Sequence, residues 1–207
     1  MRTISYSLKI IKKEDQFINE WTGGTTTELA IFPENADYKK QNFLWRLSVA
    51  TIDQEESLFT SLPSVHRITL ITDGEMVLEH QGHYRKLLKV FDQDAYEGEW
   101  ITRSKGKVKD FNVMLKNYYQ AEIEAVNLEA GTHKVFNAKN KTSFDTVTNL
   151  VYCLKSEVEI RISETKSFIL QEGDLLLVNR ASKERINIGL YNQNKEQATV
   201  IKGEIFL

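Results

Sequence analysis

The chain has 207 residues, a charged fraction of 27% and a formal net charge of -2 at pH 7. This balance excludes a global electrostatic attraction to nucleic acid or to an anionic membrane surface. The single cysteine, Cys153, excludes an intrachain disulfide and fits a reducing compartment. The first residues form no apolar run of signal-peptide length, and no segment approaches the ~20 apolar residues of a membrane span. We therefore expect a cytoplasmic globular protein.

Near the start of the chain, residues 12–21 (KKEDQFINEW) are the best candidate for a helix, about two turns long. After this segment, apolar and polar residues alternate with period two, which predicts strands. The predicted strands cover residues 26–32, 43–52, 66–72, 75–80, 83–91, 109–118, 148–155, 157–163, 166–170, 174–179 and 197–207. Glycine-containing turns separate several of them. Many short strands spaced by turns predict an all-β sandwich or barrel.

The predicted strands fall into two groups. The joint lies near residues 116–124, where one strand ends and an acidic, mixed stretch follows. Each group has about enough strands for one antiparallel jelly roll, in which hairpins close over a lumen. The expected architecture is two similar β-barrels formed by one chain.

The histidines do not predict a metal site. Two imidazoles that are two residues apart on a strand share a face and bind one metal, and none of the four histidines has that spacing. His80 and His83 flank Gln81-Gly82, which predicts an exposed hairpin tip with too few ligands for a metal. We expect no metal and no cofactor.

Nucleophilic and phosphate-binding motifs are also missing from the sequence. Cys153 alternates within a strand pattern and is typical of a small core residue. Gly23-Gly24 lacks the spacing and the lysine of a phosphate-binding loop, which favours a tight turn. Residues 103–109 (RSKGKVK) are basic but favour a solvated hairpin over a nucleic-acid site.

Three predicted strands carry polar groups on a face that is otherwise apolar or small. Arg46 and Ser48 share one face of their strand, Glu28 lies on the preceding strand, and Asp110 and Asn112 share a face of a later one. This pattern is typical of strands that are covered on both faces, with one face toward a lumen. Buried charges need partners, so Arg46 would point inward and pair with the acids or with a carboxylate ligand. A buried ion-pair network that only fixes register remains the alternative.

At these residues the sequence resembles the HutD/Ves family through four motifs in the right order. The motifs are W-x-G-G-x-T-x-E, F-x-W-R-L-S-x-A, F-S/T-x-x-P-x-x-x-R and D-F-N-x-M. They are carried by Trp21, Gly23, Gly24, Thr26 and Glu28; by Phe43, Trp45, Arg46, Leu47, Ser48 and Ala50; by Phe59, Thr60, Pro63 and Arg67; and by Asp110, Phe111, Asn112 and Met114. The motifs span residues 21–114, so the first half of the chain carries the resemblance.

The resemblance implies a bicupin fold, with two jelly-roll β-barrels of the RmlC-like cupin type at residues 1–117 and 118–207. It also implies that the usual metal-binding triad is absent. The role proposed for the family is to bind a small carboxylate from histidine breakdown, such as formylglutamate or formiminoglutamate, and to regulate the pathway. Other members are linked to stress.

Our leading hypothesis is a metal-independent bicupin that binds a small anionic metabolite in its first barrel. Arg46 is expected to pair with the ligand carboxylate, while Glu28 and Asp110 position Arg46 or meet an amine. The expected ligand-binding residues are Trp21, Thr26, Glu28, Arg46, Ser48, Arg67, Asp110 and Asn112.

The other residues of this set have supporting roles in the hypothesis. Ser48, Asn112 and Thr26 are expected to donate or accept hydrogen bonds, and Trp21 to cover the pocket. Arg67 is either a second cation for the ligand or a surface charge.

Two alternatives stay open. The first is a hydrolase or isomerase that uses Glu28 or Asp110 as a general base beside Arg46. An acid paired with arginine is a poor base near neutral pH, so this alternative needs one acid to escape the pairing. The second is a structural or protein-interaction module without a ligand. A homodimer through sheet edges fits each of these hypotheses.

Overall fold

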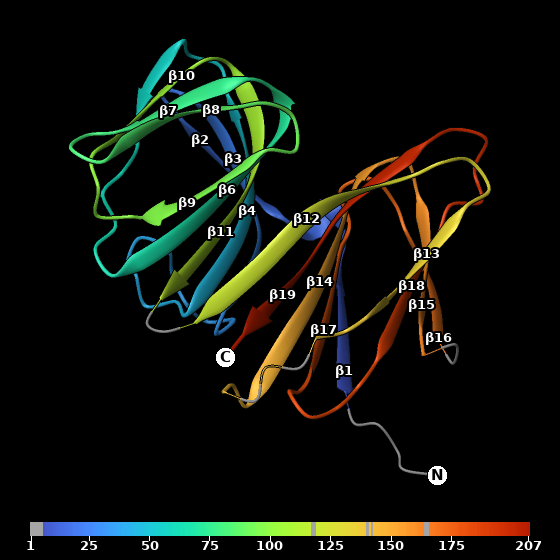
Figure 1. Ribbon diagram of the computed structural model, residues 1–207. Helices are drawn as coiled ribbons and strands as arrows, with labels where there is room; N and C mark the ends of the chain where they lie inside the picture. The colour runs from blue at the N-terminus through green and yellow to red at the C-terminus, as the bar shows by residue number, and fades with distance from the viewer. Residues whose placement is uncertain (1–5, 117–118, 140, 142, 164–165) are drawn as a thin grey trace. The chain divides into compact units, whose positions relative to one another are not determined.

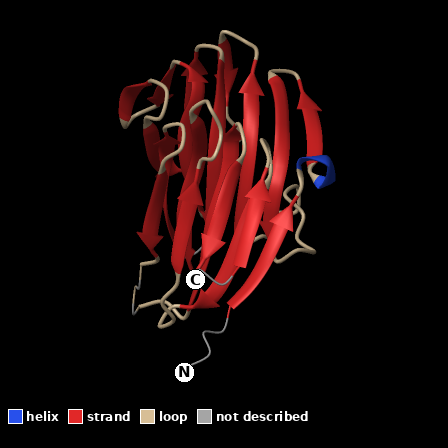
Figure 2. Cartoon of the chain, turned by 90° about the vertical axis from the view of Figure 1, so that its right-hand side faces the viewer, coloured by secondary structure: helices blue, strands red, loops and turns tan. Residues whose placement is uncertain are grey.

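The computed structural model of the protein describes residues 6–116, 119–139, 141, 143–163 and 166–207. The described residues form β-strands joined by turns and loops, and their one helical element is a short 3-10 turn, η1 (Lys13–Asp15) (Figure 2). No helix among them is long and apolar enough to cross a membrane. The chain divides into two compact units, which we call the first barrel (residues 16–119) and the second barrel (residues up to 15 together with 120–207). The expected all-β fold is confirmed.

The first barrel consists of two antiparallel sheets (Figure 1). The six-stranded sheet contains, in spatial order, β2 (Phe17–Trp21), β3 (Gly24–Phe32), β4 (Trp45–Ile52), β11 (Val108–Lys116), β6 (Val65–Gly74) and β9 (Gln93–Glu97). The four-stranded sheet contains β5 (Glu56–Leu58), β10 (Thr102–Lys105), β7 (Met76–His80) and β8 (Tyr84–Leu88).

The second barrel repeats this plan with one five-stranded and one four-stranded sheet. The five-stranded sheet contains β1 (Tyr6–Ile11), β17 (Leu175–Ala181), β14 (Thr146–Lys155), β19 (Ala198–Phe206) and β12 (Gln120–Leu128). The four-stranded sheet contains β13 (His133–Asn137), β18 (Asn187–Tyr191), β15 (Val158–Ile162) and β16 (Lys166–Leu170).

The N-terminal segment differs from its prediction in two ways. First, β1 pairs with β17, so it belongs to the second barrel and not to the predicted first unit of residues 1–117. Second, the helix predicted over residues 12–21 is wrong, because η1 and β2 occupy that stretch. The apolar residues of β2 imitate helical spacing, but pairing with β3 satisfies its backbone instead. The predicted boundary between residues 117 and 118 lies outside the described residues.

Each barrel has a core of its own between its two sheets. In the second barrel this core is almost entirely aliphatic, with Val151, Ile160, Leu176 and Val200 among its buried members. In the first barrel, a smaller cluster around Ile71, Met76, Leu78, Leu88 and Tyr96 fills one end of the interior. A second apolar cluster contains Phe43, Leu62, Val65 and Met114. Polar side chains of the six-stranded sheet share the inward face with members of both clusters.

Candidate functional site

The strand register of the six-stranded sheet aligns polar residues in rows across the first barrel. Directly opposed residues of an antiparallel pair share a face. Glu28 lies opposite Ser48, which lies opposite Asn112, which in turn lies opposite Thr69. The next row contains Arg46, Met114, Arg67 and Tyr96. We call the polar members of this face the polar wall, which comprises Glu28, Arg46, Ser48, Arg67, Thr69, Asp94, Tyr96, Asp110 and Asn112.

The polar wall faces the interior of the barrel. Ile71 lies opposite Asp110 on this face and packs in the core cluster with Met76 and Leu78 of the four-stranded sheet. Arg46 is only 3% exposed and Asp110 only 2%. The prediction that Arg46 points inward is therefore confirmed. Both faces are buried over most of β11 and the first half of β4, as predicted, whereas β3 is mostly only partly buried.

Arg46 is held by three neighbours. Its Nε donates to Glu28 Oε2 at 2.7 Å, and its Nη1 donates to Ser48 Oγ at 3.2 Å. The guanidinium carbon also lies 4.4 Å from the centroid of the Tyr38 ring. Asp110 does not share in this arrangement, because its described side-chain partner is Asn112. Of the two acids expected to position Arg46, the structure brings only Glu28 to it.

A β-bulge in β3 changes which neighbours share the face of Glu28. Strict alternation places Ala30 beside Glu28, but the register shifts between Glu28 and Ala30, so that Ile31 lies opposite Arg46. The extra residue of a bulge reverses the facing of everything after it. Ile31 thus becomes an apolar neighbour of the buried Arg46 guanidinium. Periodicity alone assigned Ile31 to the other face.

Asp110 is a buried carboxyl with a shifted pKa. Its Oδ1 accepts a hydrogen bond of 2.6 Å from the Asn112 amide, whose oxygen in turn accepts one of 2.9 Å from Thr69. Burial raises the pKa of Asp110 from 3.8 to about 7, against the opposing effects of the Arg67 charge and the Asn112 hydrogen bond. A carboxyl with this pKa exchanges its proton near neutral pH.

Arg67 is buried, which contradicts the alternative that it is a surface charge. It is 8% exposed, and its guanidinium carbon lies 5.0 Å from the Phe59 centroid and 5.3 Å from the Tyr96 centroid. No hydrogen bond or ion pair joins its side chain to any residue the structure describes, and its Nε is buried without a partner. Thus Arg46 is paired within the protein. Arg67 is a buried cation whose charge acts on the Asp110 carboxyl but which has no ion pair or hydrogen bond to the described residues.

The predicted exposed tip at His80 is wrong. His80 is 1% exposed, with Nδ1 2.8 Å from Thr102 Oγ1 and Nε2 3.0 Å from Asp94 Oδ2. Asp94 also accepts hydrogen bonds from the Tyr84 hydroxyl at 3.1 Å and from Lys86 Nζ at 3.0 Å. The alternation of β7 places His80 on the same inward face as Met76 and Leu78, and this signal was available in the sequence.

Trp21 and Thr26 lie at the edge of the polar wall, on the β2–β3 hairpin. The indole Nε1 of Trp21 donates to Thr26 Oγ1 at 3.2 Å, and the ring remains 41% exposed. A Cβ on Gly23 would lie 1.9 Å from the Trp21 ring, and one on Gly24 would lie 1.9 Å from the Thr51 carbonyl oxygen. Gly23 therefore leaves room for the Trp21 ring, and Gly24 allows the hairpin to approach the backbone of Thr51 closely.

The described residues contain no group of three or more His, Cys, Asp or Glu side chains placed to hold a metal ion. Sequence reasoning missed Thr69, Asp94 and Tyr96, which link Asn112 to His80. The Tyr96 hydroxyl lies 3.3 Å from Thr69 Oγ1, and the Tyr96 ring centroid lies 4.5 Å from that of His80. The alternation of β6 would have placed Thr69 on the inward face. β9 contains too few apolar residues for periodicity to predict it as a strand.

Two β-barrels, each made of two antiparallel sheets in a single chain, define a bicupin. The model of the HutD family matches residues 13–198, and the chain belongs to that family.

Solved structures have the same fold. The conserved protein of unknown function PA5104 from Pseudomonas aeruginosa PAO1 is 21% identical, with a TM-score of 0.80 over 97% of this chain and 100% of its own. HutD from Pseudomonas fluorescens SBW25 is 23% identical, with a TM-score of 0.69 over 95% of this chain and 98% of its own. The vicilin from Solanum melongena is 9% identical, with a TM-score of 0.65 over 95% of this chain and 84% of its own.

Proposed function

We propose that the first barrel binds a small anionic metabolite and that Arg67 receives its carboxylate. The observation that carries this proposal is a residue that is 8% exposed and whose guanidinium has no ion pair or hydrogen bond among the described residues, although its charge acts on the Asp110 carboxyl. Burying an unpaired charge is unfavourable, and a bound carboxylate would offset that cost. The guanidinium fork matches a carboxylate in two parallel hydrogen bonds.

The rest of the polar wall has a role that follows from its contacts. Arg46 already donates hydrogen bonds to Glu28 and Ser48. It would therefore act on a ligand mainly through its fixed positive charge, and less through new hydrogen bonds. Asn112 and Thr69 bring hydrogen-bonding groups to the row beside Arg67. Trp21 and Thr26 stand at the edge of the wall, where the indole would cover a ligand. The sequence hypothesis paired the ligand carboxylate with Arg46 and gave Arg67 a secondary role. In the present proposal Arg67 binds the carboxylate and Arg46 has the secondary role.

The ligand we propose is an intermediate of histidine degradation, formylglutamate or formiminoglutamate, bound in the cytoplasm in a regulatory role. Membership of the HutD family and likeness to the Pseudomonas fluorescens HutD support this assignment. Both ligands carry two carboxylates, in keeping with the two inward arginines. The structure of the Solanum melongena vicilin revealed different anionic ligands in structurally similar pockets, a precedent for anions in this fold.

Calorimetric titration of formylglutamate and formiminoglutamate, with glutamate as a reference, tests the proposal. Arg67→Met keeps the apolar stem and removes the charge, and we expect it to weaken binding at least about thirtyfold, as losing a buried charge pair does. Arg85→Met removes an exposed arginine of β8 in the same barrel and should leave affinity unchanged. Absence of binding to the wild-type protein, or equal affinity in Arg67→Met, would refute the proposal.

A second candidate function is supported by Asp110. Its pKa of about 7 is suited to a general base, and it is the acid that escapes pairing with Arg46. This favours a hydrolase or isomerase acting on the same ligand. Proton NMR of the protein with formylglutamate would detect released formate. Release that disappears in Asp110→Asn would establish the enzyme, whereas binding without any turnover would leave the binding function alone.

A further inference from the structure

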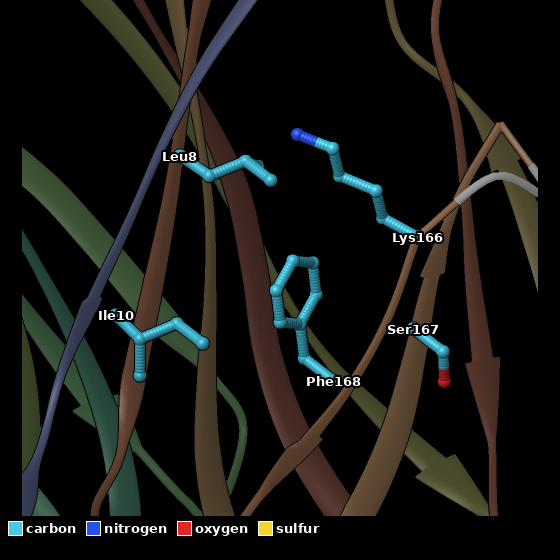
Figure 3. Close-up of a pocket in the computed structure, with 5 residues that line it drawn as sticks. All are labelled: Leu8, Ile10, Lys166, Ser167 and Phe168. Carbon is cyan, nitrogen blue, oxygen red and sulfur yellow. The ribbon is translucent and has the colours of Figure 1, made fainter.

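The second barrel has a pocket at the seam between its two sheets (Figure 3). β1 is the outer strand of the five-stranded sheet and β16 is the outer strand of the four-stranded sheet. The pocket lies between them, has a volume of about 550 Å³ and is lined by Leu8, Ile10, Lys166, Ser167 and Phe168. This volume is within the ~300–1,000 Å³ range of small-molecule sites.

The apolar part of the lining belongs to the inward faces of the two strands. Leu8 lies opposite Val178, and Phe168 lies opposite Ile160, both of which are members of the aliphatic core. Leu8, Ile10 and Phe168 are partly buried against that core. The seam is therefore a place where the hydrophobic interior of the barrel reaches the surface.

Lys166 occupies an inward position on β16. It lies directly opposite the fully buried Ile162, on the face that Phe168 shares, and a lysine there interrupts an otherwise apolar row. Its side chain extends across the seam toward Leu8 (Figure 3). Its ammonium lies 5.4 Å from the centroid of the Tyr6 ring, and no carboxylate of the described residues pairs with it.

The neighbouring polar groups are engaged elsewhere. Ser167 points away from the pocket, and its hydroxyl donates to Glu159 at 2.6 Å (Figure 3). Glu159 in turn accepts two hydrogen bonds from Arg161, at 2.7 and 3.0 Å. Lys166 is thus the single cation in the lining, above three apolar side chains. A lysine that keeps its head in water while its stem covers apolar surface is suited to an amphipathic anion.

We propose that this seam pocket binds an amphipathic monocarboxylate, a fatty acid of medium chain length. The carboxylate would meet Lys166, and the acyl chain would lie between Leu8, Ile10 and Phe168. This site is in the second barrel, takes a different ligand class from the polar wall and does not depend on the function proposed for it.

Calorimetry with decanoate at monomeric concentrations tests the proposal on the full chain. We expect decanoate to bind with one-to-one stoichiometry, and octanoate about tenfold more weakly because it loses two methylenes. Decanol has the tail without the charge and should also bind about tenfold more weakly, given the strength of a charge-assisted contact. Equal binding of decanoate and decanol, or no binding of decanoate, overturns the proposal.

Matched variants separate this site from the rest of the molecule. Lys166→Met should weaken decanoate about tenfold and leave decanol unchanged, since it removes only the ammonium. Lys195→Met removes an exposed lysine of the same barrel and should change neither. Thermal melts of both variants check that they are folded. Decanoate binding that is the same in Lys166→Met and in the wild-type protein overturns the assignment.

A second readout distinguishes the two proposals. Arg67 belongs to the first barrel and the seam pocket to the second. Arg67→Met should therefore bind decanoate with wild-type affinity. Loss of decanoate binding in Arg67→Met would place the fatty acid in the polar wall and overturn the seam site.

Discussion

The two barrels share a sheet plan, but they treat a buried arginine in opposite ways. Arg180 in the second barrel has a fully buried side chain, and Arg67 in the first is 8% exposed. Arg180 donates to the Asn149 side chain at 3.0 Å and lies 3.6 Å from the carboxylate of Glu204. It also donates to the backbone carbonyls of Lys139, Ser182 and Glu184. Arg67 has no such partner among the described residues.

This difference separates a structural arginine from one that is available to a ligand. The bonds of Arg180 join β17 to loops and to neighbouring strands, so its charge is used in holding the fold. The burial of Arg67 without a partner is unfavourable until an anion arrives. Burial alone therefore does not distinguish a ligand-binding arginine from a structural one. The hydrogen bonds and ion pairs that each arginine makes within the protein do distinguish them.

The largest expected effect follows directly from that contrast. Arg180→Met should lower the free energy of unfolding by about 3–5 kcal/mol, because it leaves buried carbonyls and the amide of Asn149 without their donor. Arg67→Met should leave the unliganded protein as stable as the wild type or more stable. Urea unfolding measures both. Equal destabilisation by the two variants would make Arg67 a structural residue and support the ligand-free alternative.

Next in size is the dependence of stability on pH through Asp110. Its pKa is about 7 in the folded protein and 3.8 as an ordinary value, so the folded state binds the proton more tightly. Its contribution is fully present below pH 4 and is lost as pH rises to about 7, a change on the order of a few kcal/mol. The difference in unfolding free energy between wild type and Asp110→Asn should fall over this window.

The control for this measurement is Asp53→Asn, which alters an exposed carboxylate of the same barrel. The pH profile of Asp53→Asn supplies the reference with which the profile of Asp110→Asn is compared. Identical profiles for the two variants would contradict the raised pKa of Asp110.

A smaller effect is expected on ligand affinity as pH changes. A carboxylate bound at Arg67 repels an ionised Asp110, so binding favours the protonated form of that carboxyl. Affinity for formylglutamate should decrease as pH rises from 6 to 8, by about tenfold at most. Calorimetry in buffers of different ionisation enthalpy would detect the proton uptake. Asp110→Asn should abolish this dependence, and an unchanged pH profile in that variant would contradict the assignment.

The smallest effect concerns the edge of the polar wall. Trp21→Phe keeps an aromatic cover but removes the indole donor to Thr26. We expect a loss of stability below about 1 kcal/mol and a few-fold loss of ligand affinity, since one partly exposed hydrogen bond is involved. Thermal melts and calorimetry measure the two quantities. A loss of affinity as large as that of Arg67→Met would move the ligand toward the hairpin.

Strand periodicity predicted the most strongly alternating strands but missed several others. Those missed include β1, the nine-residue β12 and the mostly buried β18. The predicted segments around β3, β4, β6, β11 and β14 carry strong alternation, and each coincides with an observed strand. β2 and β13 were missed because most of their residues are exposed, so alternation in them reflects no buried face. Their backbone groups are satisfied by pairing with β3 and β18 all the same.

The candidate site divides in the same manner. The inward facing of Arg46 and Ser48 was readable, because a polar residue within a fully covered strand has nowhere else to point. The burial of Arg67 was not recognised, since its strand pattern suits an exposed face equally well. The inward alternation of His80 with Met76 and Leu78 was available in the sequence but was overlooked. The environment of Arg67 and His80 depends on the Phe59 and Tyr96 rings and on Asp94, which come from other strands.

The sequence by itself determined the all-β class, the two groups of strands, the inward arginine of β4 and the family, because period-two alternation and closely spaced motifs are local properties of the chain. Only the tertiary structure decided that β1 joins the second barrel, that a bulge turns Ile31 toward Arg46, and that Arg67 is buried without a partner. These features depend on pairings between residues far apart in the chain, such as Leu8 with Val178. Such pairings are selected by the total burial and hydrogen bonding of the folded state, which no short stretch of sequence encodes.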